Sequence, residues 1–150
     1  MNPQHATLLR RHLEAENAHD LDGTLATLHP ACVFQDHATG QVWNGRDGAA
    51  AHYRQWWDCF DVEVVRKERQ SAGWLGDDVY AAEATWIGTH TGNFLDVPAT
   101  GRPISQAFVV LVAFKDGLMS EERFHYDLAS LLRQVGVDAV PSLSALPYRT

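Results

Sequence analysis

The order of the hydrophobic patterns constrains the fold of this 150-residue chain more than any other feature of its sequence. Up to about residue 60 the apolar residues recur with the period of a helix, and from there to about residue 127 they follow strand patterns. Helices that precede the strands, instead of alternating with them, predict an α+β fold with a mostly antiparallel sheet. We expect that sheet to bend strongly over the N-terminal helices, as a cone-shaped α+β barrel that encloses a pocket.

Three helices are predicted in the first 60 residues. The first begins at Pro3, which suits a first helical turn because its missing N–H would have no partner there. Asp20 is expected to cap a second helix that Pro30 closes. Asn44 is expected to cap a third helix, whose apolar residues follow helical spacing: Ala49, Ala50, Tyr53, Trp56, Trp57 and Phe60.

The remainder of the chain is predicted to form strands and one short helix. Asp116-Gly117 lies between two apolar runs and predicts a tight hairpin, because Gly tolerates the positive φ of such a turn. Phe108–Phe114 is apolar on both faces and is expected to be central and covered on both sides. A last helix, Leu128–Gln134, should end at Gly136, with an irregular tail from about residue 137. The predicted strands are Cys32–Asp36, Val62–Ser71, Val79–Thr91, Ile104–Phe114 and Leu118–Asp127.

Length and composition fit one domain, residues 1–150, and argue against several partners. With 12 basic and 19 acidic residues the net charge is −7, which disfavours nucleic acid because that binding depends on clustered Lys and Arg. The basic run Arg66–Arg69 is interrupted by Glu68 and is interpreted as the solvated face of a strand. No apolar run approaches the ~18 residues of a membrane span, and no signal peptide is recognisable. Cys32 and Cys59 lack metal-type spacing and are expected to be free thiols in the cytoplasm.

Three groups of residues stand in a characteristic order along the chain. The first is Phe34–His37, with an Asp-His pair after the first strand. The second is Gly88–Phe94, followed by Pro98–Arg102. The third is Asp116–Glu121, which continues in Asp127–Gly136. Over roughly residues 5–136 this ordered set resembles the SnoaL-like polyketide cyclases of the nuclear transport factor 2-like superfamily.

The resemblance implies a cofactor-independent enzyme of the lyase or isomerase class, which moves protons next to a carbonyl of an apolar small molecule. Asp127 matches the position of the general acid/base in the family. A carboxylate in an apolar cavity has its pKa raised toward the working pH, which suits such a role. The same carboxylate could instead cap the helix that follows it. The resemblance also implies that no metal or organic cofactor is used, and that the chain forms a homodimer through the outer face of its sheet.

Two other functions remain open on the sequence alone. One is a non-catalytic protein that binds an apolar ligand or regulates a partner. The other is an epoxide-hydrolase-like enzyme of the same superfamily, which would need a water molecule held by two acids and a bridging residue. A cavity sealed by side chains would favour the binding protein, and an open one with an acid at its wall would favour an enzyme.

Several further residues are candidates for the site. Strand alternation places Arg123, His125 and Asp127 on one face. His125 could share a proton with Asp127 or orient a substrate carbonyl, or the three residues could form a charged rim at the cavity mouth. The remaining candidates for substrate contact could equally be loop caps, structural hydrogen-bonding groups or core aromatic residues: Asp36, His37, Tyr53, Trp56, Trp86 and His90.

Overall fold

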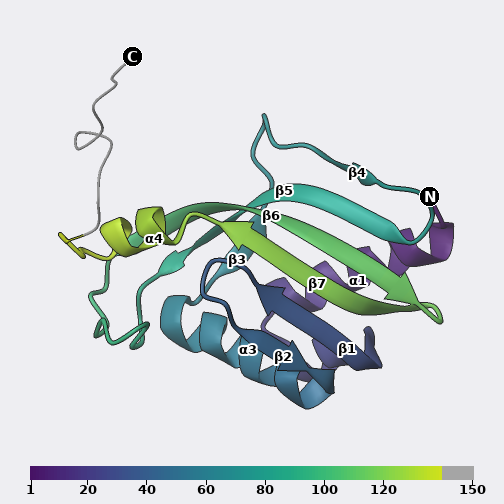
Figure 1. Ribbon diagram of the computed structural model, residues 1–150, viewed down its shortest axis with the longest axis horizontal. Helices are drawn as coiled ribbons and strands as arrows, with labels where there is room; N and C mark the ends of the chain where they lie inside the picture. Colours follow the sequence, from purple (N-terminus) through teal and green to yellow (C-terminus); the bar gives the residue numbers. More distant parts are fainter. Residues whose placement is uncertain (140–150) are drawn as a thin grey trace.

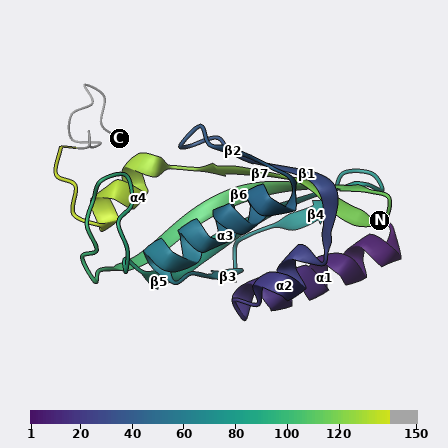
Figure 2. The same ribbon diagram turned by 90° about the horizontal axis from the view of Figure 1, so that it is seen from below.

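The computed structural model describes residues 1–139, and its main feature is a strongly curved, unclosed sheet of seven strands with N-terminal helices on its concave side (Figures 1 and 2). The strand order is β2-β1-β7-β6-β5-β3, with β4 paired to β5. Within residues 1–139, only β1 and β7 pair in parallel. The predicted α+β cone is therefore confirmed. The tail predicted from residue 137 lies, from residue 140 onward, outside the described residues.

Three helices precede most of the sheet, as predicted. Helix α1 spans Pro3–Asn17, and α2 spans Leu21–Leu25, where the side chain of Asp20 accepts a hydrogen bond from the amide of Gly23. Helix α3 spans Gly45–Phe60. The strands and the last helix follow the bounds β1 Leu28–Asp36, β2 Val42–Asn44, β3 Glu63–Val65, β4 Ala72–Trp74, β5 Val79–Thr89, β6 Pro103–Lys115, β7 Leu118–Tyr126 and α4 Leu128–Gln134.

The first strand begins earlier than predicted and runs through Pro30. Proline is tolerated because the β1–β7 ladder is irregular between Leu28 and Val33, so its missing N–H costs no ladder bond there. Strand β2 was not predicted. It occupies the residues directly before α3, and the side chain of Asn44 makes no capping bond.

The predicted strand Val62–Ser71 is wrong in its middle, where the chain forms a loop between β3 and β4. The amide of Gln70 donates to the carbonyl of Lys67, and the side chain of Gln70 accepts from the amide of Lys67 and donates to the carbonyl of Ala84. A turn closed in this way takes the basic run Arg66–Arg69 out of the sheet.

The β6–β7 hairpin turns at Asp116 and Gly117, which have φ of 52° and 74° and so confirm the predicted tight turn. Strand β6 is central, between β5 and β7. Its outer face is not covered by other elements within residues 1–139, since Val109 is 39% exposed. The expectation that both faces are covered is therefore met only on the concave side, because all three N-terminal helices lie there (Figure 2).

The even-numbered residues of β5, of β6 and of β7 from Glu122 onward face the helices, while beyond the β6–β7 register shift the buried residue of β7 is Met119, opposite Phe114. The register pairs Ala84 with Phe108 and Phe108 with Tyr126, and the first two of these are buried. Gly88 on the same face lies so close to the end of α3 that an added Cβ would stand 2.2 Å from the carbonyl oxygen of Phe60. Helix α3 therefore contacts the backbone of the sheet directly at this point.

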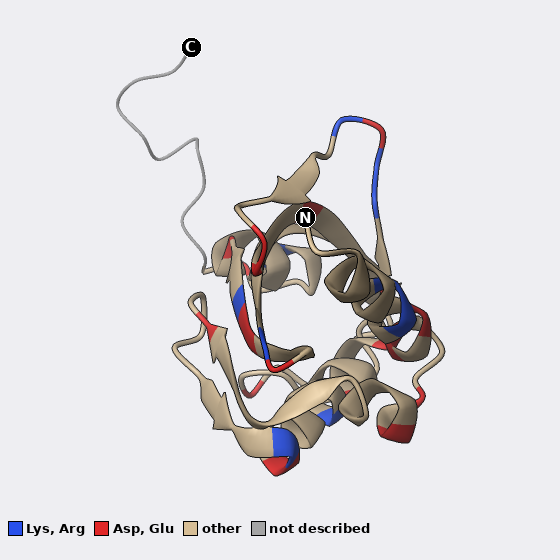
Figure 3. Cartoon of the chain, turned by 90° about the vertical axis from the view of Figure 1, so that its right-hand side faces the viewer, with Lys and Arg blue, Asp and Glu red and all other residues tan. Residues whose placement is uncertain are grey.

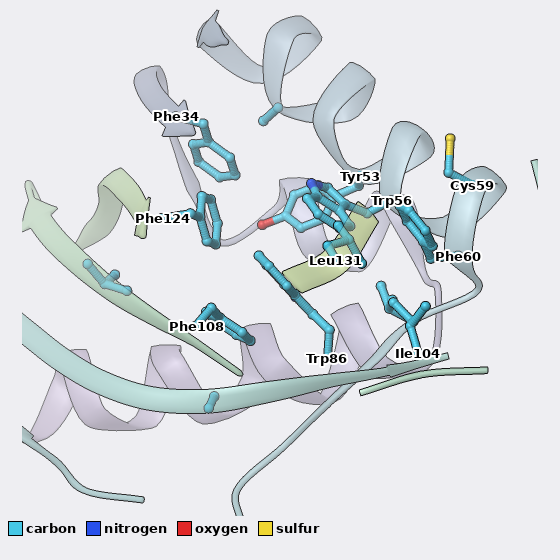
Figure 4. Close-up of a cluster of buried hydrophobic side chains, with 14 of the residues drawn as sticks. Phe34, Tyr53, Trp56, Cys59, Phe60, Trp86, Ile104, Phe108, Phe124 and Leu131 are labelled. Carbon is cyan, nitrogen blue, oxygen red and sulfur yellow. The ribbon is translucent and has the colours of Figure 1, made fainter. Parts of the chain in front are cut away.

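Aromatic side chains fill the space between α3 and the sheet (Figure 4). Trp56 of α3 stacks on Trp86 of β5 with ring centroids 4.4 Å apart, and Trp86 stacks on Phe108 of β6 at 3.9 Å. Tyr53 and Phe124 continue this layer (Figure 4). The interior of the cone is thus packed beneath α3, and the space that remains lies beneath α1.

Candidate functional site

A cavity of about 100 Å³ lies between α1 and the concave face of the sheet. Helix α1 contributes four residues at i, i+3, i+4 and i+7 spacing, which share one helix face: Leu9, His12, Leu13 and Glu16. Alternate residues of β5, β6 and β7 form the opposite wall: Tyr80, Ala82, Ala84, Phe108, Val110, Val112, Glu122 and Phe124. Val64 and Arg66 complete the lining. The wall is mainly apolar, so its few ionisable groups stand out.

Three hydrogen-bonding or charged groups converge on one nitrogen of His12. Its Nε2 atom lies 3.2 Å from Oε1 of Glu122 and 3.7 Å from Oε2 of Glu16. The hydroxyl of Tyr53 lies 3.0 Å from the same nitrogen. His12 and Glu122 are 2% and 5% exposed, so this cluster is shielded from bulk water. His12 and Glu16 come from α1 and Glu122 comes from β7, two elements that are far apart in the chain, while Tyr53 comes from α3.

Thr27 determines which nitrogen of His12 faces the cluster. The hydroxyl of Thr27 donates its single hydrogen to the carbonyl of Thr24 at 2.6 Å. Its oxygen can then only accept from Nδ1 of His12, which lies 2.6 Å away. Nδ1 of His12 therefore carries a hydrogen in every protonation state, and Nε2 is the nitrogen that exchanges protons with the carboxylates.

The environment moves the pKa values of the cluster toward neutrality. Burial alone lowers the pKa of His12, but the hydrogen bond and charge of Glu122, together with the charge of Glu16, outweigh it and raise the pKa above 6.5. Burial raises the pKa of Glu16 to about 7, against the opposing charge of His12. Burial and the two glutamates raise the pKa of Tyr53, so its phenol stays protonated. A carboxyl group that titrates near pH 7 beside a charged partner suits general acid–base chemistry.

The raised pKa values of Glu16 and His12 predict a contribution to stability that is lost as the pH rises. Glu16 and His12 both bind their protons more tightly in the folded chain, so their contribution is full at low pH. The Glu16 part falls between about pH 4.5 and 7, and the His12 part is lost as the pH rises through its raised pKa. Their contribution to the free energy of unfolding should therefore decrease from pH 5 to 8, by about 1.4 kcal/mol for each unit of pKa difference. Burial lowers the pKa of His52 to about 3, which acts in the opposite direction below pH 6.5, so a net decrease is expected above pH 6.5.

Urea unfolding followed by tryptophan fluorescence at several pH values measures this dependence. Relative to the wild type, Glu16→Gln should gain stability as the pH rises from 5 to 7, because the neutral amide has no proton to release. Glu14→Gln, which changes an exposed glutamate of the same helix, should retain the wild-type slope. Equal slopes in all three proteins would contradict the assignment.

Asp127, the predicted acid/base, is not among the residues that line this cavity. Its Oδ1 atom accepts a hydrogen bond from the amide of Ser130 at 3.1 Å and so caps α4. Its side chain is 63% exposed, with Arg133 at 3.9 Å. The expectation that it lines the cavity is not met, because it follows the end of β7 and turns back toward α4. Its catalytic role stays a prediction.

His125 and Arg123 lie on one face of β7, as the alternation predicted, but it is the outer face, which is turned away from the cavity. The ring of His125 stacks on His37 with centroids 4.3 Å apart. Partial burial, His37 and Arg123 together lower the pKa of His125. The Nε atom of Arg123 lies 3.8 Å from Oε2 of Glu121. The structure thus brings His125 and His37 together, on the side opposite the cavity.

Asp36 is buried on the concave side, next to the aromatic layer. Its Oδ2 atom accepts a hydrogen bond from the hydroxyl of Tyr126 at 2.8 Å, while Oδ1 accepts from the amides of Ala38 and Thr39. The ring of Tyr126 packs edge-on against Trp56 and Trp86. Asp36 therefore closes a loop and anchors Tyr126 near the predicted tryptophans.

His90 and Tyr53 are also buried. Nδ1 of His90 lies 2.9 Å from the hydroxyl of Thr100, and its ring stacks on Phe60. Tyr53 is the predicted residue that contacts the cavity cluster, through His12. The substrate-contact roles of these residues stay predictions.

The cluster residues themselves were not predicted, although the sequence carries a signal for each. His12 and Glu16 fall on the same helical stripe as Leu9 and Leu13. Glu122 occupies the inward phase of β7 together with Phe124. An ionisable residue in the apolar phase of a helix or strand is unusual, because burying a charge is costly unless it has a partner. The signal in the sequence is therefore a His or Glu at a position where the spacing of the element predicts an apolar residue.

Within residues 1–139, no group of three or more His, Cys, Asp or Glu side chains is arranged to hold a metal ion. In the same part of the chain, no helix has the length and apolar character needed to cross a membrane.

Comparison with known proteins places this geometry in context. The sequence model described as SnoaL-like polyketide cyclase matches residues 6–135. Among curated protein sequences, no match is found. A candidate polyketide cyclase from Silicibacter sp. tm1040 is 23% identical, with a TM-score of 0.78 over 91% of this chain and 98% of the other. A candidate SnoaL-like cyclase from Jannaschia sp. CCS1 is 24% identical, with a TM-score of 0.78 over 90% and 93%. TsrD from Streptomyces laurentii is 27% identical, with a TM-score of 0.75 over 91% and 97%.

Proposed function

Since the chain belongs to the SnoaL-like polyketide cyclase family, we propose that it is a cofactor-independent enzyme that moves protons next to a carbonyl group of an apolar small molecule. The observation that supports this proposal is the convergence of Glu16, Glu122 and His12 at the wall of an otherwise apolar cavity. The proposed reaction is a cyclisation or an isomerisation.

In the proposed reaction, Glu122 is the base. Its carboxylate, paired with protonated His12, takes a proton from the carbon next to the carbonyl. The C–H electrons form a C=C bond, and the carbonyl oxygen takes a proton from Glu16, whose raised pKa keeps it partly protonated at neutral pH. Return of a proton to a different carbon gives an isomer, and attack of the enol on a second carbonyl closes a ring.

The exchange of α-protons for deuterium in a small cyclic ketone tests this function without the natural substrate. Cyclopentanone is small and uncharged, and its exchange in D₂O is followed by proton NMR. The proposal expects exchange above the buffer rate. A protein that binds cyclopentanone without accelerating exchange would instead support the non-catalytic binding function.

The two acids also support a second candidate function, an epoxide-hydrolase-like reaction. Glu16 and Glu122 flank His12, which is the arrangement of two acids and a bridging residue that such a reaction needs for its water molecule. Hydrolysis of cyclopentene oxide to the diol, in the absence of ketone exchange, would favour this candidate.

The homodimer is part of the same proposal, with the outer sheet face as the interface. The exposed apolar side chains Val109 and Ile87 lie on that face and support it. Light scattering at micromolar concentration should give twice the chain mass of 16.7 kDa. Val109→Glu should shift the protein toward the monomer, because an unpaired charge in an interface core is costly. A monomer mass for the wild type would contradict the dimer.

The cytoplasmic location and the absence of any metal or organic cofactor complete the proposal. Cys32 and Cys59 are both buried free thiols, which supports a reducing compartment.

A further inference from the structure

An open groove of about 300 Å³ continues from the cavity along α1. Its walls are formed by α1, β4 and β5: Ala6, Leu9, Arg10, Leu13, Trp74 and Tyr80. Leu9, Leu13 and Tyr80 line both spaces, so these three side chains stand between the cavity and the groove. A molecule that occupies both spaces passes over these side chains.

The small size of the cavity indicates that its ligand extends beyond the cavity into the groove. Pockets for small molecules usually measure about 300–1,000 Å³. The cavity alone is about 100 Å³, and only together with the groove does the site reach the usual range. Trp74 and Tyr80 offer broad apolar surfaces for the part of the ligand that lies outside.

The rim between the two spaces is basic, in contrast to the acidic interior. Arg66 is exposed at the rim, and its Nη2 atom donates to the hydroxyl of Tyr80 at 2.7 Å. Arg10 lines the groove. Within residues 1–139, neither arginine forms an ion pair with a carboxylate. Figure 3 shows the basic parts of α1 and of the loop after β3 on the same side of the molecule.

The change from acidic side chains inside the cavity to basic side chains at the rim orients a charged ligand. An anionic group is repelled from the inner end, where Glu16 and Glu122 lie, and attracted to the rim, in a chain whose net charge is −7. The guanidinium of Arg66 keeps free N–H groups that match a carboxylate, and such charge-assisted pairs are stronger than neutral hydrogen bonds.

Resting on the function proposed above, we propose that the substrate is an elongated organic acid. Its small carbonyl-bearing end occupies the cavity, and its carboxylate meets Arg66 and Tyr80 at the rim. Its apolar or aromatic remainder lies on Trp74 in the groove.

Titration calorimetry with three probes tests this substrate class without any turnover. The probes are 4-phenylbutanoate, the neutral 4-phenylbutan-1-ol and butanoate, which lacks the ring. The wild type should bind 4-phenylbutanoate about tenfold more tightly than the alcohol, and about tenfold more tightly than butanoate. Equal affinity for the acid and the alcohol, or no binding of any probe at millimolar concentration, would overturn the proposal.

Two variants of the loop after β3 show whether the preference for the acid depends on a contact with Arg66 or on the positive charge of the loop as a whole. Arg66→Gln should abolish the preference for the acid while the alcohol binds as before. Arg69→Gln, at an exposed arginine that lines neither space, should retain the preference. Trp74→Ala should weaken the binding of the acid and the binding of the alcohol to the same extent. Equal losses in the two arginine variants would refute the role of Arg66. Binding of the three probes is measured without turnover, and cyclopentanone carries neither a charge nor an aromatic ring. Failure here and failure of the proton-transfer function therefore remain distinguishable.

Discussion

Glu122→Gln is expected to slow the exchange of cyclopentanone α-protons by about 10²–10⁴-fold, the usual contribution of a positioned general base. Glutamine has nearly the shape of glutamate and can still contact Nε2 of His12, which lies 3.2 Å from Oε1 in the wild type. It has no carboxylate to take the proton. The loss should therefore appear in the rate, while the circular dichroism spectrum and the unfolding midpoint show a folded protein.

The matched control is Glu121→Gln, one residue earlier on the same strand. Glu121 points to the outer face of β7, and its side chain is 49% exposed, so the rate should not change. Asp127→Asn tests the sequence-based assignment in the same assay, since that assignment expects the 10²–10⁴-fold loss there. A full loss in Asp127→Asn with wild-type exchange in Glu122→Gln would reject the cavity cluster as the catalytic group. Exhaustive dialysis against EDTA should leave the wild-type rate unchanged.

Gly88→Ala is expected to destabilise the protein by about 3 kcal/mol, at the upper end of the cost of overpacking. The added Cβ would lie 2.2 Å from the carbonyl oxygen of Phe60, and 3.1 Å from both the carbonyl oxygen of Asp61 and Cα of Val62. These are backbone atoms, so no side-chain rotation can relieve the overlap and α3 has to move away from β5. Urea unfolding measures the loss as a lower midpoint.

Gly73→Ala in β4 is the matched control, because a Cβ at Gly73 meets nothing within 4 Å. That variant should be unchanged or more stable by up to about 1 kcal/mol, since alanine has less conformational freedom to lose on folding. If Gly88→Ala were as stable as Gly73→Ala, the close contact between α3 and the sheet would be wrong.

The fold could be predicted from the sequence because its signals are local. The helical stripe of α3, the capping residue Asp20 and the Asp116-Gly117 turn each act within a few residues, and each lies where it was predicted. The errors occur where tertiary contacts override local patterns. The loop at Arg66–Arg69 depends on Gln70 reaching the carbonyl of Ala84 on a neighbouring strand, which no local pattern reveals.

The site was less predictable because it depends on which face of each element points inward. The family resemblance drew attention to Asp127, at a strand-to-helix junction that can be read directly from the sequence. The phase of β7 is set instead by its register with β6, which pairs Glu122 with Val112 and turns both toward α1. The sequence places Glu122 in phase with Phe124 and Glu121 out of phase, but only the register shows that this phase faces α1.

The parallel pairing of β1 with β7 has a consequence for how the protein folds. Phe34 pairs with Glu122, so strands from opposite ends of the described chain must meet before the sheet is complete. Closing so long a loop is slow, because chain entropy is lost before the contacts form. On a ribosome α1, α2, α3 and β5 emerge before β7, so His12 has no Glu122 to pair with until β7 is synthesised. The cluster of His12, Glu16 and Glu122 is then completed only when β7 joins the sheet, and a chain truncated before β7 would lack this cluster, however well its N-terminal helices had formed.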